Sequence, residues 1–476
     1  MISLFDYQQS AINELRSCYA KGAIAPLLVL PTGGGKTICF SYMAKIASDK
    51  GKKVLLIAHR RELVGQISAA LKLWGVDHGV ILPDAKITKH SVQVAMVQTL
   101  ANRIKLDKAG RYRFDFVIID EAHHATKNST WGHVLAHNLG AKLLGVSATP
   151  IRLDGKGLGT HTDGYFDAMV VGPTVSDLIA KGRLAAPVVY GPSQAIDLSS
   201  VKSQGGDFVT SQLAGMVDKA SITGDAVYHY QKFCDRQSAI AFCITVDHSH
   251  HVVDQFKACG YQAAVLTGKT PDKERKRMIR DLGNGQLHVL ASCNVVSEGT
   301  DIPAVSAAIL LRPTESYALA MQQIGRALRV YPGKDKAVIL DHAGNVLRHG
   351  LPTDPVEWSL DGLKRKKGKQ KAPAKPCGCG LVLANSTRVC PNCGFSFVAE
   401  AGERGAVVDG ELVELTPEML AQIKIKKRRE LAKARTKADL VELGKRREYK
   451  DPVFWADKIL EDRRNWRNGH AARGGL

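Results

Sequence analysis

Residues 30–37 read Leu-Pro-Thr-Gly-Gly-Gly-Lys-Thr, and they stand between an apolar run and a helical pattern. Glycines let backbone amides surround phosphate oxygens, and a helix N-terminus adds a partial positive charge. In this setting Lys36 contacts the β- and γ-phosphates of a nucleotide, and the Thr37 hydroxyl ligates Mg²⁺. The strict pattern begins with glycine, whereas this chain has Leu30 there. We predict a phosphate-binding loop that uses Thr32, Gly33, Gly34, Gly35, Lys36 and Thr37.

Two adjacent carboxylates, Asp120 and Glu121, end the apolar run of the sequence Val-Ile-Ile-Asp-Glu-Ala-His-His. Ligands of open α/β sheets bind at the carboxyl ends of strands. Because Mg²⁺ keeps several waters, one carboxylate is enough to hold it, and we assign that role to Asp120. Glu121 is then placed to polarise the water that attacks the γ-phosphate. We expect His123 to couple the nucleotide to neighbouring segments.

Four cysteines cluster after residue 376 in a CxC and a CxxC pair, and glycine follows each pair. Four thiolates on tight turns suit tetrahedral Zn²⁺, whose binding supplies folding energy to a segment too small for a core. A redox dithiol is the alternative. Six further cysteines are scattered along the chain, which fits a reducing compartment. We predict a structural zinc site formed by Cys377, Cys379, Cys390 and Cys393.

The elements that must position these residues are short apolar runs alternating with helical patterns. Continuous apolar runs predict strands buried on both faces, and therefore parallel sheets flanked by helices. The first four runs precede residue 150 and the others follow residue 235, which indicates two α/β domains. The eight runs are 26–30, 53–59, 116–120, 142–148, 239–244, 263–268, 287–292 and 307–311. We expect α/β domains at 1–183 and 184–350, a basic linker at 351–375, a zinc ribbon at 376–398 and a basic helical tail at 399–476.

The charge of the chain points to a polyanionic partner. The formal net charge is +20, and residues 361–476 alone carry 26 basic and 15 acidic side chains. A basic chain with a basic tail favours nucleic acid. No apolar run approaches the roughly 18 residues that span a bilayer, and the N-terminus does not read as a secretory signal. We expect no membrane partner and a cytoplasmic, nucleoid-associated protein, with a phage origin also open.

The tail allows two interpretations. Residues 421–450 hold twelve Lys or Arg and four acidic residues, and Trp455 and Trp466 follow. Basic and aromatic side chains together are typical of surfaces that neutralise phosphates and stack bases. A solvated helical face with Trp455 packed on the body is the alternative. Thr436 followed by Asp439 predicts a helix start within this tail.

In their order along the chain, these residues resemble the motifs of superfamily 2 helicases and translocases of the DEAD/DEAH-box type. The resemblance covers roughly residues 1–345 and implies two RecA-like domains that hydrolyse ATP with Mg²⁺. Segments that resemble the family's further motifs are Phe5 with Tyr7 and Gln8 for adenine, 59–63 for motif Ia, 97–99 for Ib, 147–150 for III, 242–245 for IV, 297–301 for V and 322–329 for VI.

The resemblance also implies roles for the second domain. Arg329 is the arginine finger, Arg326 assists it and Gln322 orients, while Gly299 and Asp301 contact or couple to the nucleotide. A guanidinium from across a cleft stabilises the charge of phosphoryl transfer. The family further implies phosphate contacts that carry no sequence information. The candidates for these contacts are Arg60, Gln98, Thr99, Thr245, Thr267 and Thr300.

Residues 309–316 and 340–345, with a cysteine-rich segment behind them, are similar to the RadD-type bacterial DNA repair helicases. This resemblance implies single-stranded or branched DNA as substrate, a role in repair, recombination or replication, and recruitment by a single-strand-binding protein. Three alternatives stay open: an RNA helicase, a remodelling subunit that hydrolyses ATP without separating strands, and a restriction-system motor.

Overall fold

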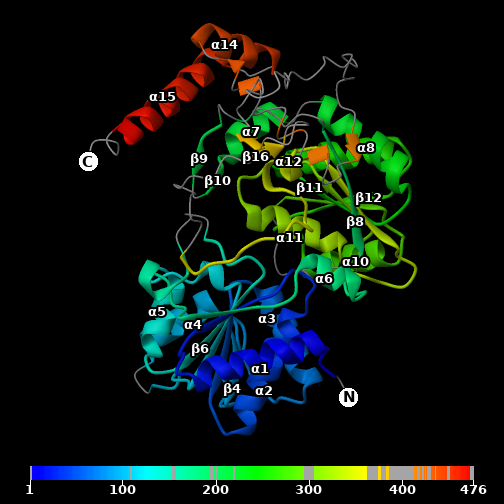
Figure 1. Ribbon diagram of the computed structural model, residues 1–476. Coiled ribbons are helices and arrows are strands. Elements are labelled where there is room, and N and C mark those ends of the chain that lie inside the picture. The colour runs from blue at the N-terminus through cyan, green and yellow to red at the C-terminus, as the bar shows by residue number, and fades with distance from the viewer. Residues whose placement is uncertain are drawn as a thin grey trace.

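The computed structural model folds into two α/β lobes (Figure 1). The structure describes residues 3–107, 110–152, 157–192, 198, 201–204, 206–217, 220–293, 305–361, 374–376, 382–384, 412–414, 419–420, 423, 425, 430–431, 433–434, 436–447 and 451–471. No helix in this part of the chain is long and apolar enough to cross a bilayer.

The first lobe is a parallel sheet with strand order β3-β4-β2-β5-β6-β1-β7. Its strands are β1 (Pro26–Val29), β2 (Val54–Ala58), β3 (Gly79–Ile81), β4 (Val92–Met96), β5 (Phe116–Asp120), β6 (Lys142–Ser147) and β7 (Ala168–Val171). Its helices are α1 (Asp6–Ala20), α2 (Lys36–Asp49), α3 (Arg61–Leu73), α4 (Val97–Leu106) and α5 (Thr130–His137), with 3-10 turns at Ala122–His124 and Thr160–Thr162.

Both faces of this sheet are buried, because successive strand residues enter opposite cores. Leu56 and Ile118 pack with side chains of α1, α2 and α3 on one face. Leu55 and Val117 pack with α4 and α5 on the other face. This explains why the strands are continuous apolar runs and confirms the prediction of a parallel sheet covered by helices.

The second lobe repeats the design, with strand order β12-β13-β11-β14-β15-β8-β18. All its neighbouring strands run parallel except β18, which pairs antiparallel with β8. Its strands are β8 (Ala186–Pro192), β11 (Ala239–Phe242), β12 (Ala263–Leu266), β13 (Val289–Ser292), β14 (Ala307–Leu310), β15 (Lys336–Asp341) and β18 (Leu412–Glu414). Its helices are α6 (Val175–Ala180), α7 (Thr210–Val217), α8 (Ala220–Cys234), α9 (Val246–Ala258), α10 (Asp272–Gly283), α11 (Tyr317–Ala327) and α12 (Asn345–His349), and β9 (Ser203–Gln204) pairs with β10 (Asp207–Phe208).

Each of the eight apolar runs contains a strand of one of these two sheets. Strand β4 is not among the runs named from the sequence, and Gln93 interrupts its apolar residues. Gln93 is nevertheless buried, and its amide nitrogen donates to the carbonyl of His90 at 3.0 Å. A satisfied amide therefore occupies a core position, which a pattern of apolar residues cannot reveal.

The chain returns from the second lobe to the first in residues 351–361. Gly159 donates its amide to the Leu360 carbonyl at 2.9 Å, and His161 lies 2.7 Å from the Asp361 carboxylate. Trp358 packs against the α4–α5 core of the first lobe and against Tyr317 of α11. The residues predicted as the start of a linker therefore join the two lobes by side-chain packing.

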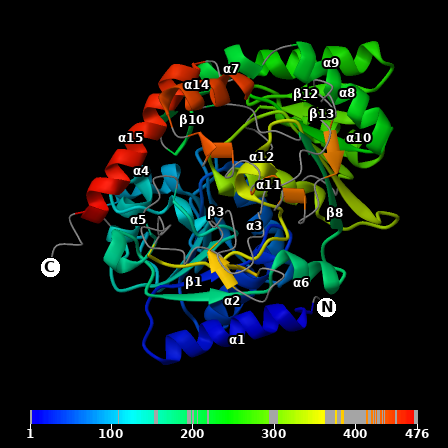
Figure 2. The same cartoon turned by 45° about the horizontal axis from the view of Figure 1, so that its top comes forward.

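The described part of the tail contains a helix pair, α14 (Lys437–Arg446) and α15 (Pro452–Ala471), seen at the edge of the molecule in Figure 2. Thr436 caps α14 and forms a capping box with Asp439, as the sequence predicted. Trp455 is buried against Leu440 and Leu443 inside this pair. Because Trp455 is buried within the tail, its ring is not available to stack on bases. Strand β16 (Ala374–Pro376) pairs antiparallel with β17 (Val382–Ala384).

Candidate active site

A cavity of about 460 Å³ lies between the two lobes, and both lobes contribute to it. The first lobe provides its phosphate loop and the two carboxylates at the end of β5, and the second lobe provides α11 and the residues that follow. The residues that line the cavity are Thr32, Gly33, Gly35, Lys36, Thr37, Ile38, Leu63, Gln66, Asp120, Glu121, Arg183, Gln322, Arg326, Arg329 and Val330. The structure thus brings together most of the residues predicted from the sequence to act on a nucleotide.

The phosphate loop depends on glycine at two points. Gly33 and Gly35 have φ of 86° and 81°, which is the left-handed region that other residues avoid. At Gly35 a Cβ atom would also lie 2.2 Å from Nε2 of the Gln8 side chain. Helix α2 begins directly after Gly35, so its unpaired N-terminal amides face the cavity side of the loop.

Lys36 is the first residue of α2, and its ammonium group points back toward the Leu30 carbonyl at 3.5 Å. Burial lowers the pKa of Lys36, and the carboxylates of Glu121 and Asp120 oppose this shift. The Lys36 ammonium group therefore lies near two carboxylates in a buried environment, where its electrostatic contact with a phosphate is strong.

Asp120 is the last residue of β5, and Glu121 follows it directly. Asp120 is 5% exposed, and its Oδ1 accepts the Glu121 amide at 3.0 Å. Glu121 has φ of 51°, an uncommon conformation for a residue with a side chain, and its Oε2 is buried without a hydrogen bond from the described residues. The hydroxyl of Thr37 and the carboxylate of Asp120 line the same cavity, and such oxygen ligands fit Mg²⁺.

A chain of polar contacts joins Glu121 to the end of the neighbouring strand, β6. His123 Nδ1 lies 3.5 Å from Glu121 Oε2 and 3.1 Å from the Ser147 hydroxyl at the end of β6. The Ser147 hydroxyl donates to the Thr149 carbonyl at 3.0 Å and accepts the Thr149 amide at 3.1 Å. These contacts link Glu121 to residues 147–149 through the side chains of His123 and Ser147.

Helix α11 carries the second lobe's contribution. Ser316 caps the helix by accepting the Leu319 amide at 3.2 Å, and Gln322 and Arg326 are buried on the side that faces the cavity. Arg329 follows the end of the helix. Its backbone bridges to Leu184, which belongs to the segment that enters the second lobe from the first.

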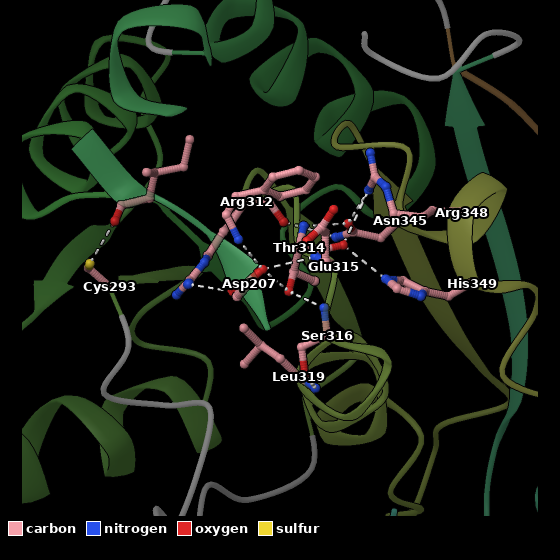
Figure 3. A network of polar contacts seen from close by, with 12 residues as sticks. Asp207, Cys293, Arg312, Thr314, Glu315, Ser316, Leu319, Asn345, Arg348 and His349 are labelled. Carbon is pink, nitrogen blue, oxygen red and sulfur yellow. Dashed lines mark hydrogen bonds and ion pairs between the residues drawn. The ribbon is translucent and has the colours of Figure 1, made fainter. Parts of the chain in front are cut away.

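A polar network sets the start of α11 (Figure 3). The Asp207 carboxylate of the β9–β10 hairpin accepts hydrogen bonds from Arg312 Nη2 at 2.9 Å, the Thr314 hydroxyl at 2.8 Å and the Glu315 amide at 2.9 Å. The Thr314 hydroxyl accepts the Ser316 amide at 3.0 Å. Asp207 thus fixes the loop between β14 and α11.

Residues 341–345 complete this network from the other side. Asn345 accepts the Thr314 amide at 3.0 Å and donates to the Arg312 carbonyl at 2.9 Å. The Asp341 carboxylate accepts the amides of Asn345 and Val346 at 3.0 and 2.7 Å, and burial raises the pKa of Asp341 to about 6. Residues 312–314 and 341–345 therefore contact one another and support α11.

Tyr7 and Gln8 lie behind the loop, and these two residues and Gly34 of the loop do not line the cavity. The Tyr7 hydroxyl donates to the Gly34 carbonyl at 3.2 Å, and Gln8 Oε1 accepts the Phe5 amide at 3.0 Å. Gln8 is 3% exposed. In this arrangement both side chains shape the phosphate loop.

Several predicted residues are not tested by this geometry. Gly299, Thr300 and Asp301 lie outside the described residues, as do Cys377, Cys379, Cys390 and Cys393. Two of the proposed phosphate contacts have structural partners: Thr245 caps α9, and the Thr267 hydroxyl accepts the Lys269 amide at 3.2 Å.

Sequence reasoning missed five residues that line the cavity: Ile38, Leu63, Gln66, Arg183 and Val330. Arg183 is the most informative of them, since its guanidinium lies over the Phe5 ring at 3.6 Å from the ring centre. A single arginine between two domains gives no sequence signal. Only the folded path of the chain brings it to the cavity.

Two family models match this chain. The model described as "Type III restriction enzyme, res subunit" matches residues 1–152, and the "Helicase conserved C-terminal domain" matches residues 226–331. With the two parallel RecA-like sheets, these matches define the class as an ATP-dependent helicase.

Relatives along most of the chain identify the family. The "51.5 kDa protein" of Lactococcus phage (isolate 7-9) is 33% identical over 86% of this chain and 88% of its own length. The "Putative ATP-dependent helicase IRC3" of Saccharomyces cerevisiae is 32% identical over 72% of this chain and 51% of its own length, so the chain spans about half of that relative. The chain belongs to the superfamily 2 helicases that combine these two domains, a family it shares with the phage protein and IRC3.

A solved structure supports the fold independently. A fragment of a "putative HsdR subunit of a type I restriction enzyme" from Vibrio vulnificus YJ016 superimposes with a TM-score of 0.56 over 73% of this chain and 65% of that one. Sequence identity is 20%. This similarity concerns the path of the backbone alone.

Proposed function

We propose that this chain is a DNA helicase or translocase, in which ATP hydrolysed between the two lobes drives movement on single-stranded or branched DNA. The observation that carries the proposal is the single cavity lined by Lys36, Asp120 and Glu121 of one lobe and by Arg326 and Arg329 of the other. A nucleotide in this cavity contacts both lobes. Binding therefore closes the cleft, and phosphate release opens it.

Each side chain has a role in this scheme. Lys36 contacts the β- and γ-phosphates, Glu121 orients the attacking water, and Gln322 orients the transferred group. Arg329, assisted by Arg326, stabilises charge on the γ-phosphate oxygens. Thr37 and Asp120 hold Mg²⁺, which neutralises phosphate charge when bound. Tyr7 and Gln8 support the loop beside the adenine, and Gly299 and Asp301 couple to the nucleotide.

DNA is the proposed partner because of charge. The formal net charge is +20, and Lys445 and Arg446 are exposed at the end of α14. Exposed basic side chains bind the phosphates of nucleic acid without recognising its sequence. The segments that resemble RadD-type helicases suggest a role in DNA repair and a single-strand-binding protein as recruiter. We further propose that the four clustered cysteines bind structural Zn²⁺.

Steady-state ATP hydrolysis tests this function. Wild type and Lys36→Ala are compared without nucleic acid, with single-stranded DNA, and with single-stranded RNA of the same length. We expect strong stimulation by DNA that is lost in Lys36→Ala. Stimulation by RNA alone would reassign the substrate, and ATP hydrolysis without DNA strand separation would favour a translocase or remodelling subunit.

A further inference from the structure

Lys334 lies in the loop between α11 and β15, and its ammonium group contacts three backbone carbonyls. It donates to Val305 at 2.7 Å, to Arg329 at 2.8 Å, and also to Ala327. A lysine has three N–H donors, so all of them are used. The side chain is half-buried, and no acidic side chain is among these partners.

The three carbonyls have one thing in common: they surround the point where α11 ends. Ala327 is the last residue of the helix, and Arg329 follows two residues later. The last carbonyls of a helix have no partner within the helix, and a cation there also balances the helix dipole. Val305 precedes β14, so Lys334 ties the end of α11 to the amino edge of the second sheet.

A second contact holds the same residues from the other side. The Ala185 amide donates to the Leu328 carbonyl at 2.8 Å, and Leu184 bridges to Arg329. The backbone of residues 327–329 is thus clamped between Lys334 and the segment that connects the lobes. The Arg329 side chain extends from this clamped backbone to the lining of the cavity that contains the phosphate loop.

We propose that Lys334 is a positioning residue for Arg329, which holds the backbone of that arginine so that its guanidinium reaches the γ-phosphate. This inference rests on the proposed function, in which Arg329 acts on bound ATP. A displacement of about 1 Å in a catalytic group costs about 100-fold in rate. Loss of the three carbonyl contacts therefore lowers kcat and leaves ATP binding by the first lobe in place.

The variant Lys334→Met keeps the aliphatic stem and removes the donors, and Lys334→Arg restores donors. Lys336→Met is the matched control, because Lys336 is an exposed lysine two residues further along, at the start of β15. With saturating DNA, we expect Lys334→Met to lower kcat about 10- to 100-fold with KM for ATP within about threefold. Lys334→Arg recovers part of kcat, and Lys336→Met behaves as wild type. If Lys334→Met does not fold, Lys334→Gln takes its place.

A double-mutant cycle with Arg329→Ala separates positioning from simple helix capping. In the Arg329→Ala background, Lys334→Met lowers kcat no further if the two residues act as a unit. Unchanged kcat in Lys334→Met, or equal losses in both backgrounds, would overturn the positioning role. If Arg329→Ala itself leaves kcat unchanged, it is the proposed function of Arg329 that fails.

Discussion

Gly325 of α11 lies directly against Thr32 of the phosphate loop, so that a Cβ atom on residue 325 would stand 2.7 Å from the Thr32 Cβ. The contact joins the two lobes beside the cavity. Only glycine permits this approach, because real side-chain atoms do not come so close without displacement of one partner. The glycine in the segment 322–329 is thereby explained by packing between the lobes.

Gly325→Ala therefore prevents the lobes from closing on ATP. We expect kcat for DNA-stimulated ATP hydrolysis to fall at least about tenfold, since a small displacement across the cavity suffices. Gly65→Ala is the control: Gly65 lies in α3, and a Cβ there meets no atom within 4 Å. Helix propensity predicts that this control gains about 0.5–1 kcal/mol in unfolding free energy. Equal activity of the two variants would contradict the packing argument.

The Asp207 network makes a prediction for stability. Asp207→Ala removes the carboxylate that pairs with Arg312, whose side chain is 10% exposed. Removal of one member of a buried ion pair costs about 3 kcal/mol. Chemical denaturation measures this loss. Asp84→Ala is the matched control, because the Arg61–Asp84 pair is exposed to solvent and its removal should leave the unfolding midpoint unchanged.

The Lys334 contacts predict a pH dependence of the reaction. Burial lowers the pKa of Lys334 from 10.5 to about 8, so its ammonium loses a proton as pH rises through 8. We expect kcat to fall above pH 8 in the wild type and to stay level in Lys334→Arg, whose guanidinium remains charged. Arg236, Tyr331, Asp335 and Lys336 line the same cavity as Lys334 and are unchanged between the two proteins. Identical profiles would exclude Lys334 as the titrating group.

The titration of Lys334 does not itself destabilise the fold over this range, because its effect on stability has the opposite sign. Between about pH 8 and 10.5, Lys334 carries its proton more often in the unfolded chain than in the folded chain. The contribution of Lys334 to the unfolding free energy therefore rises with pH over this range. The difference between thermal melts of the wild type and Lys334→Met at each pH measures this contribution.

The proposed zinc site predicts one Zn²⁺ per purified chain, bound by the four clustered cysteines. Cys390→Ser together with Cys393→Ser should reduce this content to near zero. The Cys18→Ser and Cys259→Ser substitutions serve as the control, since both are free thiols in the first and second lobes. Metal content is measured by plasma emission. Full occupancy in the Cys390/Cys393 variant would contradict the assignment.

The sheets were predictable because a strand buried on both faces must be apolar throughout, as in Leu55 and Leu56 of β2. The same logic explains Asp120, which ends such a strand, and the phosphate loop, which follows one. Gln93 escaped prediction because its partners satisfy a buried amide. Arg183 and Lys334 escaped because their contacts join residues far apart along the chain or in irregular loops.

The central claim is that catalysis requires a residue from each lobe, and Arg329→Ala tests it most directly. Steady-state ATP hydrolysis is measured with saturating DNA, beside Arg277→Ala, which removes an exposed arginine of α10. We predict that Arg329→Ala lowers kcat about 10³-fold or more with KM for ATP changed by less than about threefold, and that Arg277→Ala matches the wild type. A kcat of Arg329→Ala within twofold of the wild type would contradict the account.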